Sequence, residues 1–516
     1  MAAIRNSKTA RPSDRHVWLA GAALALWAAA GSWFFYAHGY VLFYGDAEAH
    51  LNIARSLLDS RTPGSDQLGT VWLPLPHLLI APFAAVDRLW RTGLAGTIPS
   101  AAAFVAGGCF LFAAAARVFE STAAAAAVAL YALNPNLLYL ASTAMTEPLF
   151  FAALLALLYF TARFSSTDGY GAVVLAGAAA LAAALTRYEG WFLIPFTTAY
   201  IFCAVKRNRW LKAALFVALA TAGPLLWLAH NWWFAGDLLD FYRGPYSPKA
   251  IQGGAYYPGW NEWGKACLYF RTAARWCAGW PLLILGAAGA LVLMRRRALW
   301  PLALLLLPPV FYLWSMHSSG GSPVFVPDLW PNSYYNTRYG LTLFPAAVFA
   351  AAALVTLAPP RFRRAAAAAI VVIASATWAV HHSPEQWITW KESQVNSLAR
   401  RAWTRHAAEF LAPRYRRGSG IISSFGDMTG IFRSMGLPLR EVLTNNNWPL
   451  WPAAVARPDL FLWEEWAVVM RDDRVAMGLR KARSSGLDYE LVRAIQVPGA
   501  KAIEIYHRRR HLRKTE

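Results

Sequence analysis

Charged residues and cysteines are both scarce in this sequence. Only 15% of the 516 residues are charged, whereas 57% are hydrophobic and 25 are tryptophan. Soluble domains carry about 25% charged residues, so this composition excludes a purely water-soluble globular protein. The cysteines lack the paired short spacing of zinc or redox motifs, and we assign them no chemistry. They are Cys109, Cys203, Cys267 and Cys277.

Acidic residues are fewer than basic residues: the chain has 28 Asp and Glu against 49 Lys and Arg, which gives a formal net charge of +21. In a membrane protein such an excess lies in cytoplasmic loops beside anionic lipid. The chain has no basic-aromatic nucleic-acid motif and no glycine-rich loop that could cradle a diphosphate. We therefore expect membrane lipids as partners and no nucleic acid.

Long apolar runs fill most of residues 1–382. A helix that crosses a bilayer needs about 20 apolar residues. The runs cover residues 17–36, 72–90, 97–116, 121–140, 147–163, 170–186, 190–205, 211–233, 277–294, 299–316, 339–357 and 365–382. Because 72–90 contains Pro74, Pro76 and Pro82, we expect it to be re-entrant or interfacial. The sequence therefore predicts an all-α polytopic membrane bundle of about eleven transmembrane helices.

Short basic loops orient this bundle, because Lys and Arg concentrate on the cytoplasmic side. They are the N-terminal Arg5, Lys8, Arg11 and Arg15 and the loops 206–209, 295–297 and 361–364. Alternation of the spans then assigns a second set of segments to the outside. These are residues 37–96, 234–276 and 317–338 and the turns at 146–148 and 186–189.

The composition changes after residue 382, and we expect residues 383–516 to form a small soluble α/β domain. The apolar patterns at 420–425, 459–463 and 489–493 predict strands, and 472–484 predicts a helix. An odd number of spans places this domain on the extracytoplasmic side. The Ala- and Arg-rich composition is typical of bacteria, so we expect a multi-pass protein of the bacterial inner membrane with a periplasmic domain.

The segment Tyr44-Gly45-Asp46-Ala47-Glu48-Ala49-His50 places two carboxylates and an imidazole directly after the first span. Apolar residues at helical spacing predict a short amphipathic helix from Glu48 to Asp59. In one interpretation Asp46 caps this helix and Glu48 is a first-turn acid favoured by the helix dipole. His50, four residues after Asp46, could share a helix face with it around a divalent metal, or it could be a hydrogen-bonded scaffold residue. We assign no metal site and expect His50 among the residues that bind the substrate or its phosphate, because arginines can neutralise that phosphate without a metal.

Four short motifs, all expected outside, resemble those of the GT-C superfamily of integral-membrane glycosyltransferases. They are Gly45-Asp46-Ala47-Glu48, Thr146-Glu147-Pro148, Thr186-Arg187-Tyr188-Glu189-Gly190-Trp191 and Asn336-Thr337-Arg338-Tyr339-Gly340. The pattern is similar to protein O-mannosyltransferases and lipid A aminoarabinose transferases over residues 15–380. The resemblance implies a GT-C-like catalytic bundle over residues 1–382 and a variable outer domain over 383–516.

The resemblance also implies roles for the acids of these motifs. Asp46 matches the carboxylate taken as general base, which would accept the proton of an acceptor hydroxyl. Glu48 would help to orient the sugar, and Glu147 matches the acid that opens a later span in relatives. For Glu147 the alternative is a structural acid in a first turn that Thr146 caps and Pro148 opens.

External arginines supply the expected phosphate site, because guanidinium groups bind phosphate oxygens in pairs. Arg338 beside Tyr339 is the first candidate and Arg271 the second. Alternatively, each external basic residue pairs with an acid such as Asp237, Asp240, Glu262 or Asp328, or anchors a lipid headgroup. For Arg187 and Glu189 we expect a structural ion pair.

The sequence thus predicts an inverting glycosyltransferase that uses a polyprenyl-phosphate-linked sugar and an unidentified glycan, lipid or protein acceptor, and requires no cofactor. The use of a divalent metal stays open, because some GT-C relatives have an Asp-rich metal site. One rival is a multi-span transporter or lipid flippase, which would carry ionisable groups near the midplane of its helices. Another is a non-catalytic receptor that binds through its outer domain.

Overall fold

The computed structural model describes residues 14–205, 207–318, 321–484 and 486–509. The chain divides into two compact units. The helical unit comprises Met1–Tyr40, Thr70–Pro76 and Thr97–Glu392, and the sheet unit comprises Val41–Gly69, His77–Gly96 and Ser393–Glu516. Of the basic residues expected to be cytoplasmic, Arg5, Lys8, Arg11 and Lys206 lie outside the described residues.

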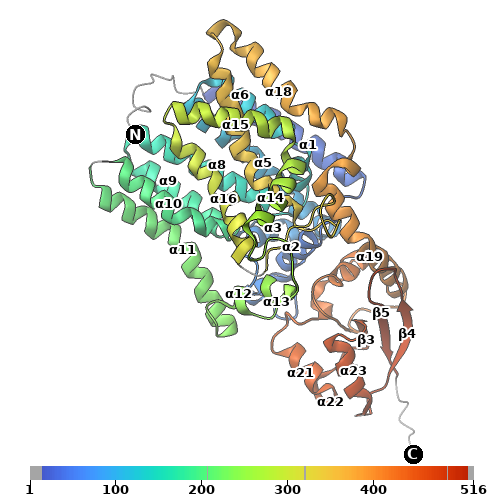
Figure 1. Ribbon diagram of the computed structural model, residues 1–516. Coiled ribbons are helices and arrows are strands. Elements are labelled where there is room, and N and C mark those ends of the chain that lie inside the picture. The colour runs from blue at the N-terminus through green and yellow to red at the C-terminus, as the bar shows by residue number, and fades with distance from the viewer. Residues whose placement is uncertain (1–13, 206, 319–320, 485, 510–516) are drawn as a thin grey trace, which may run out of the picture. The chain divides into compact units, whose positions relative to one another are not determined.

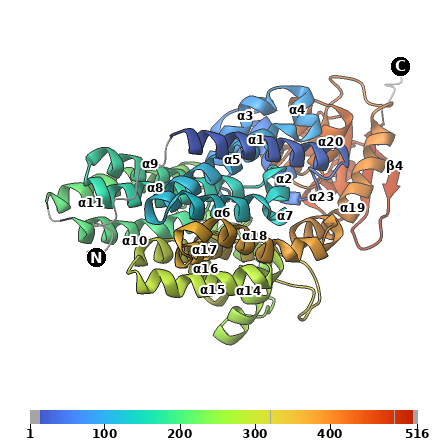
Figure 2. The same ribbon diagram turned by 90° about the horizontal axis from the view of Figure 1, so that it is seen from above.

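The helical unit is a bundle in which α8, α9, α10 and α11 lie side by side, and α15 packs on α17 and α18 (Figures 1 and 2). Its longer helices are α1 Asp14–Ala37, α5 Leu94–Val118, α6 Ser121–Ala132, α7 Pro135–Ala141, α8 Glu147–Thr167, α9 Tyr170–Ala184, α10 Glu189–Ala204, α11 Arg209–Ala235, α14 Trp263–Ala278, α15 Trp280–Arg295, α16 Leu299–Ser318, α17 Phe344–Ala353 and α18 Arg363–Val380. Its short elements include α12 Asp240–Arg243, α13 Pro248–Gln252, η3 Thr337–Leu343, η4 Leu354–Leu357, η5 Pro360–Phe362 and η6 Pro384–Gln386.

Among the described residues, seven helices are long and apolar enough to cross a membrane. Two bent pairs raise the number to nine: α6 with α7, bent by 70°, and α14 with α15, bent by 106°. The predicted count of about eleven spans is not confirmed. The difference rests on α9 and α10, which have 15 and 16 residues. At about 1.5 Å per residue, each is shorter than the roughly 30 Å hydrocarbon core.

The proline-rich stretch 72–90 does not form a long helix. It contains α3, Leu75–Ala84, and the start of α4, Asp87–Thr92. With ten residues, α3 is among the apolar helices too short to count as a candidate span. The expectation that this stretch does not cross as a straight helix is therefore confirmed.

Contacts within the helical unit join helix ends that the sequence assigns to the same side. Near the loops expected in the cytoplasm, Lys212 bonds Asp168 at 2.6 Å and Arg363 pairs with Glu120. At the opposite ends of these helices, Arg187 and Arg338 gather around Glu147. The loops that the sequence assigns to the cytoplasm thus contact one another, and so do the segments that it assigns to the outside.

The sheet unit contains a five-stranded mixed sheet in the order β2-β1-β3-β5-β4. The strands are β1 Ile421–Ile422, β2 Val442–Leu443, β3 Trp466–Met470, β4 Tyr489–Ile495 and β5 Ile503–Arg508. β1 pairs in parallel with β2 and β3, whereas β5 runs antiparallel to β3 and β4. The unit's other elements are α2 Gly45–Ser56, η2 Ser65–Leu68, α4, α20 Thr429–Met435, η7 Leu439–Glu441, α21 Leu450–Ala456, α22 Pro458–Phe461 and α23 Arg474–Ser484, with most of α3 and of α19 Ile388–Leu411.

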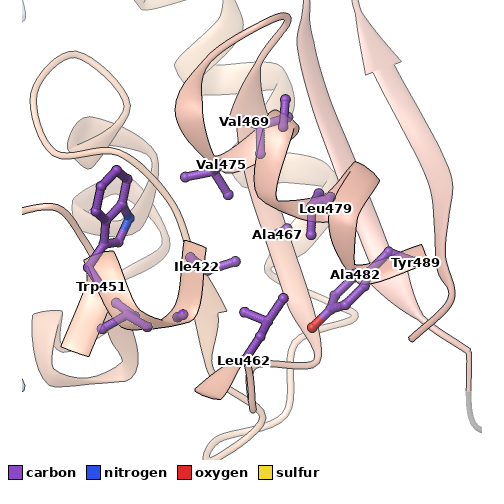
Figure 3. Packing of buried hydrophobic residues seen from close by; sticks show 12 residues of the cluster. Ile422, Trp451, Leu462, Ala467, Val469, Val475, Leu479, Ala482 and Tyr489 are labelled. Atoms are coloured by element: carbon purple, nitrogen blue, oxygen red, sulfur yellow. The ribbon is translucent and has the colours of Figure 1, made fainter. Parts of the chain in front are cut away.

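One apolar cluster packs α23 on this sheet (Figure 3). Val475 and Leu479 of α23 face Ile422 and Ala467 of the central strands. The predicted strand at 489–493 and helix at 472–484 are present as β4 and α23. Of 420–425, only Ile421 and Ile422 form a strand.

The predicted strand at 459–463 is wrong, because most of this stretch forms α22. Pro458 at its first position favours a helix start. In this stretch Leu462 is buried, while Leu460, Phe461 and Trp463 are exposed. The apolar run therefore does not alternate as a half-buried strand would.

Candidate active site

Asp46 lies in the first turn of α2 and keeps part of its surface open to solvent. The N-cap of α2 is Tyr44, so the interpretation of Asp46 as the helix cap is wrong. The first turn favours negative charge, because its backbone N–H groups lack helical partners. Residues 47–56 are all buried, so the helix is enclosed on every face and not amphipathic as predicted. A rigid helix thus presents an accessible carboxylate.

Two arginines enclose Glu48, which is only 4% exposed. Arg400 donates Nη1 to Oε2 at 2.8 Å, and Arg433 donates Nε to Oε1 at 2.6 Å. Burial alone would raise the pKa of Glu48, but the charges and hydrogen bonds of Arg433 and Arg400 outweigh it and lower the pKa. Glu48 therefore ties α2 to α19 and α20, and contact with a sugar would require the arginines to move.

Asp427 is a second accessible carboxylate near α2, and the sequence analysis missed it. One of its oxygens lies 3.8 Å from the point where a Cβ on Gly45 would stand. Desolvation raises the pKa of Asp427, the negative charges of Glu48 and Asp46 add to this, and Arg400 opposes it. The Asp427 side chain remains exposed. No local motif marks this residue, because only the fold brings it close to α2.

His50 is buried in α2 and is paired with a second histidine. Its Nδ1 lies 2.9 Å from Nε2 of His77, which is also buried. Among the described residues, no group of three or more His, Cys, Asp or Glu side chains could hold a metal ion. The His50–His77 pair joins α2 to α3 within the sheet unit. Its role in substrate binding stays a prediction.

Glu147 opens α8 in the helical unit and is 3% exposed. Its Oε1 accepts hydrogen bonds from Arg187 at 3.0 Å and from Arg338 at 3.1 Å. Thr146 makes no side-chain cap; its hydroxyl accepts from Arg187 at 2.7 Å instead. The other oxygen, Oε2, is buried and has no hydrogen-bond partner among the described residues. Glu147 therefore retains an acceptor that a ligand could use.

Arg338 lies between two carboxylates and is 8% exposed. Besides Glu147 it binds Glu392, donating Nη1 to Oε1 at 2.9 Å. Glu392 also accepts the backbone N–H groups of Asn336 at 3.2 Å and Thr337 at 2.7 Å. The sequence analysis missed Glu392, which lies in α19 outside any motif. Since Arg338 already binds two acids, a phosphate there would have to share its donors.

Tyr339 and Arg187 complete this buried network. Tyr339 stacks on Tyr312 with ring centroids 4.2 Å apart, and the Arg187 guanidinium lies 5.8 Å from the Tyr339 ring. Arg187 also donates Nε to Glu189 at 2.5 Å, which confirms the expected ion pair. The network joins α8, α10, α16 and η3.

The basic residues of the helical unit that the sequence assigns to the outside divide into paired and unpaired groups. Arg243 pairs with Asp237, Lys265 with Glu262, and Arg275 with Asp328. These three residues therefore pair with acids, which was the alternative to phosphate binding. Arg271 on α14 is exposed and makes no hydrogen bond or ion pair with the described residues. It is thus the predicted phosphate ligand whose charge is still available.

Comparison with known proteins gives one family match and several structural neighbours. Residues 74–233 match the family of dolichyl-phosphate-mannose-protein mannosyltransferases. No curated protein matches the chain in sequence.

Two similar solved structures are those of ArnT from Cupriavidus metallidurans. The form bound to undecaprenyl phosphate aligns with a TM-score of 0.55 at 16% identity, covering 93% of this chain and 97% of that one. The apo form gives 0.54 at 15% identity, covering 89% and 93%.

A more distant structure is the oligosaccharyltransferase of Archaeoglobus fulgidus in complex with zinc and sulfate. It gives a TM-score of 0.45 at 13% identity, covering 87% of this chain and 68% of that one. The ArnT fold and the family match together confirm the resemblance of this chain to the GT-C superfamily of membrane glycosyltransferases.

Proposed function

We propose that the protein is a membrane glycosyltransferase that transfers a hexosyl or pentosyl group from a polyprenyl-phosphate-linked donor to an acceptor hydroxyl on the extracytoplasmic face. One observation carries the proposal: an accessible carboxylate, Asp46, stands on a buried helix in a chain that has the ArnT fold. The ArnT structure bound to undecaprenyl phosphate supports the class of donor.

In this proposal Asp46 is the general base. The acceptor oxygen bonds to the anomeric carbon while its proton passes to the Asp46 carboxylate. The bond from the anomeric carbon to the phosphate oxygen breaks, and polyprenyl phosphate leaves with the electron pair. A single displacement from the opposite face inverts the configuration of the sugar. A positioned base of this kind typically contributes a factor of about 100 to 10,000.

The neighbouring groups of the sheet unit support this role. Glu48, clamped by Arg400 and Arg433, holds the first turn of α2 in place and is a positioning residue. Asp427 adds negative charge beside Gly45. A fixed helix keeps the base in one geometry and so reduces the entropy lost on reaching the transition state.

In the helical unit, Glu147, Arg338, Tyr339 and Arg271 remain proposed substrate ligands. Support for Glu147 comes from its unpartnered buried oxygen, and support for Arg271 from its exposed and unpaired guanidinium. An arginine can neutralise the charge that develops on a departing phosphate without a metal ion. The proposal therefore requires no cofactor.

The proposed side of the reaction follows from charge. The loops 207–209, 295–297 and 361–364 are basic, whereas Asp46 and Glu147 lie in segments that alternation assigns to the outside. A nucleotide sugar would have to act from the cytoplasmic side. A lipid-linked donor instead enters between helices and reaches the outer surface with its phosphate.

The decisive experiment offers the purified protein in detergent a panel of radiolabelled sugars, each on undecaprenyl phosphate and on a nucleotide. We expect transfer only from the lipid-linked form, with one polyprenyl phosphate released per sugar transferred. Transfer from a nucleotide sugar without a lipid intermediate would contradict the proposal. Movement of labelled lipid across proteoliposomes with no new glycosidic bond would favour the flippase alternative.

A further inference from the structure

A basic groove lies between α4 and α20, both within the sheet unit. Its lining consists of Asp87, Arg88, Arg91, Thr92, Arg433 and Ser434, and it encloses about 640 Å³. It is separate from the accessible carboxylates Asp46 and Asp427, which are absent from its lining. Three arginines against one aspartate make it a candidate site for an anion.

The groove is preformed by contacts between its two walls. Arg433 donates Nη1 to the backbone oxygen of Arg91 at 2.5 Å, which joins α20 to α4. Arg91 in turn lies over Gly436, where an added Cβ would stand 2.7 Å from its guanidinium carbon. Gly436 also has a φ of +68°, a conformation that other residues adopt rarely. A larger side chain there would displace Arg91.

Charge pairing leaves two of the three arginines available. Arg433 is paired with Glu48, with Nε 2.6 Å from Oε1, and shares this carboxylate with Arg400. Asp87 is paired with Arg55 at 2.6 Å. Arg88 and Arg91 are exposed and make no ion pair with the described residues. They are three residues apart on a helix and so lie on neighbouring positions of one face. The groove therefore carries an excess of two positive charges.

The segment that precedes α4 has exposed apolar side chains, which indicate that the anion lies at the membrane interface. Leu78 and Leu79 of α3 are 52% and 39% exposed, and Val86 is 51% exposed. Exposed apolar side chains followed by arginines are typical of segments that lie in a membrane interface, with the guanidinium groups at headgroup level. Both features point to a lipid phosphate.

We propose that this groove binds the phosphate headgroup of an anionic bilayer phospholipid through Arg88 and Arg91. The bound lipid would anchor α4 at the membrane surface. It would also stabilise α2, because Arg433 links the wall of the groove to Glu48. This inference does not depend on the identity of the transferred sugar or on Asp46 acting as base.

The test measures lipid binding to delipidated protein by native mass spectrometry, with phosphatidylglycerol, phosphatidylcholine and inorganic phosphate as separate probes. The double variant Arg88→Gln with Arg91→Gln removes both free charges. Its matched control is Arg416→Gln with Arg417→Gln, which removes two exposed charges of the sheet unit outside the groove lining. Each basic residue beside an anionic lipid contributes roughly fivefold to affinity, so we expect the groove variant to bind phosphatidylglycerol about 25-fold more weakly.

The control variant should bind phosphatidylglycerol as the unchanged protein does, and phosphatidylcholine should bind weakly to all three. Equal phosphatidylglycerol binding by the groove variant would overturn the proposal. Binding of inorganic phosphate that depends on Arg88 and Arg91, without binding of the lipid, would assign the groove to a free phosphate and also overturn it. Thermal unfolding of each variant in nanodiscs of known lipid content separates loss of binding from loss of fold. Since no turnover is measured, failure here leaves the proposed transferase activity to its own test.

Discussion

Arg433 donates its Nε proton to Oε1 of Glu48 at 2.6 Å, joining residues that lie 385 positions apart in the chain. Glu48 stands two residues after the proposed base, so the C-terminal part of the sheet unit fixes the helix that carries Asp46. The C-terminal segment that carries Arg400 and Arg433 thus holds the short acidic motif in place.

Replacing Glu48 by Gln should destabilise the sheet unit strongly. The amide cannot compensate two buried guanidinium groups, and removal of one partner of a buried ion pair costs about 3 to 5 kcal/mol. We expect a lower thermal midpoint in detergent. Glu490→Gln is the control, because it disrupts a surface pair with Arg509 and should change stability by about 1 kcal/mol or less. An unchanged midpoint for Glu48→Gln would show that the clamp on α2 contributes little.

Replacing Asp46 by Asn should abolish most transfer and leave the fold intact. The amide keeps the size of the carboxylate but cannot accept the acceptor proton, so we expect kcat to fall by a factor of about 100 to 10,000. Asp66→Asn removes an exposed acid from the same stretch, Val41–Gly69, and should turn over normally. Near-normal turnover by folded Asp46→Asn would leave Asp46 as a first-turn acid favoured by the helix dipole.

Arg338 should resist even conservative replacement. A lysine has a single ammonium group and cannot span Glu147 and Glu392 as the guanidinium does. We expect Arg338→Lys to lose about 3 kcal/mol or more of stability, since a buried carboxylate is left uncompensated. Arg243→Lys, at an exposed pair with Asp237, serves as the matched control. Equal thermal midpoints for the two variants would argue against a structural network around Arg338.

Asp427 should make stability depend on pH. Its pKa is raised above the ordinary 3.8 by desolvation and by the charges of Glu48 and Asp46, against Arg400. The folded protein therefore keeps a proton that the unfolded chain has already lost, so this contribution is full below the ordinary value and disappears as pH rises through the folded pKa. As the pH rises from the ordinary value of 3.8 through the folded pKa, Asp427→Asn should lose less stability than the unchanged protein. Because the side chain is exposed, the expected difference is small. If the free energy of unfolding changes with pH in the same way for both proteins, the prediction is wrong.

Single-cysteine labelling in intact cells tests the proposed orientation. The four native cysteines are first replaced, because Cys203 and Cys267 are exposed. Cysteines at Thr92 and at the exposed Ile251 should both react with an impermeant reagent, and one at the exposed Arg296 should be protected. Protection at Thr92 with labelling at Ile251 would mean that the segment containing α3 crosses the membrane.

The sequence alone determined the class of the protein. Apolar runs, basic loops and prolines in 72–90 are local properties, and the bilayer acts on each segment separately. Short motifs were sufficient to suggest the superfamily and to mark Asp46 and Glu147. Local patterns also predicted α23 and most of β4.

Only the tertiary structure determined what surrounds these acids. Arg400, Arg433 and Asp427 gather around the start of α2, and Glu392 reaches Arg338, although none of the four belongs to a motif. The number of spans also depended on the fold, because α9 and α10 have only 15 and 16 residues, and the apolar run 121–140 bends by 70° between α6 and α7. Burial and charge pairing depend on residues far apart in the chain. A carboxylate's role therefore follows from its partners in space, as the enclosed Glu48 and the accessible Asp46 demonstrate within one helical turn.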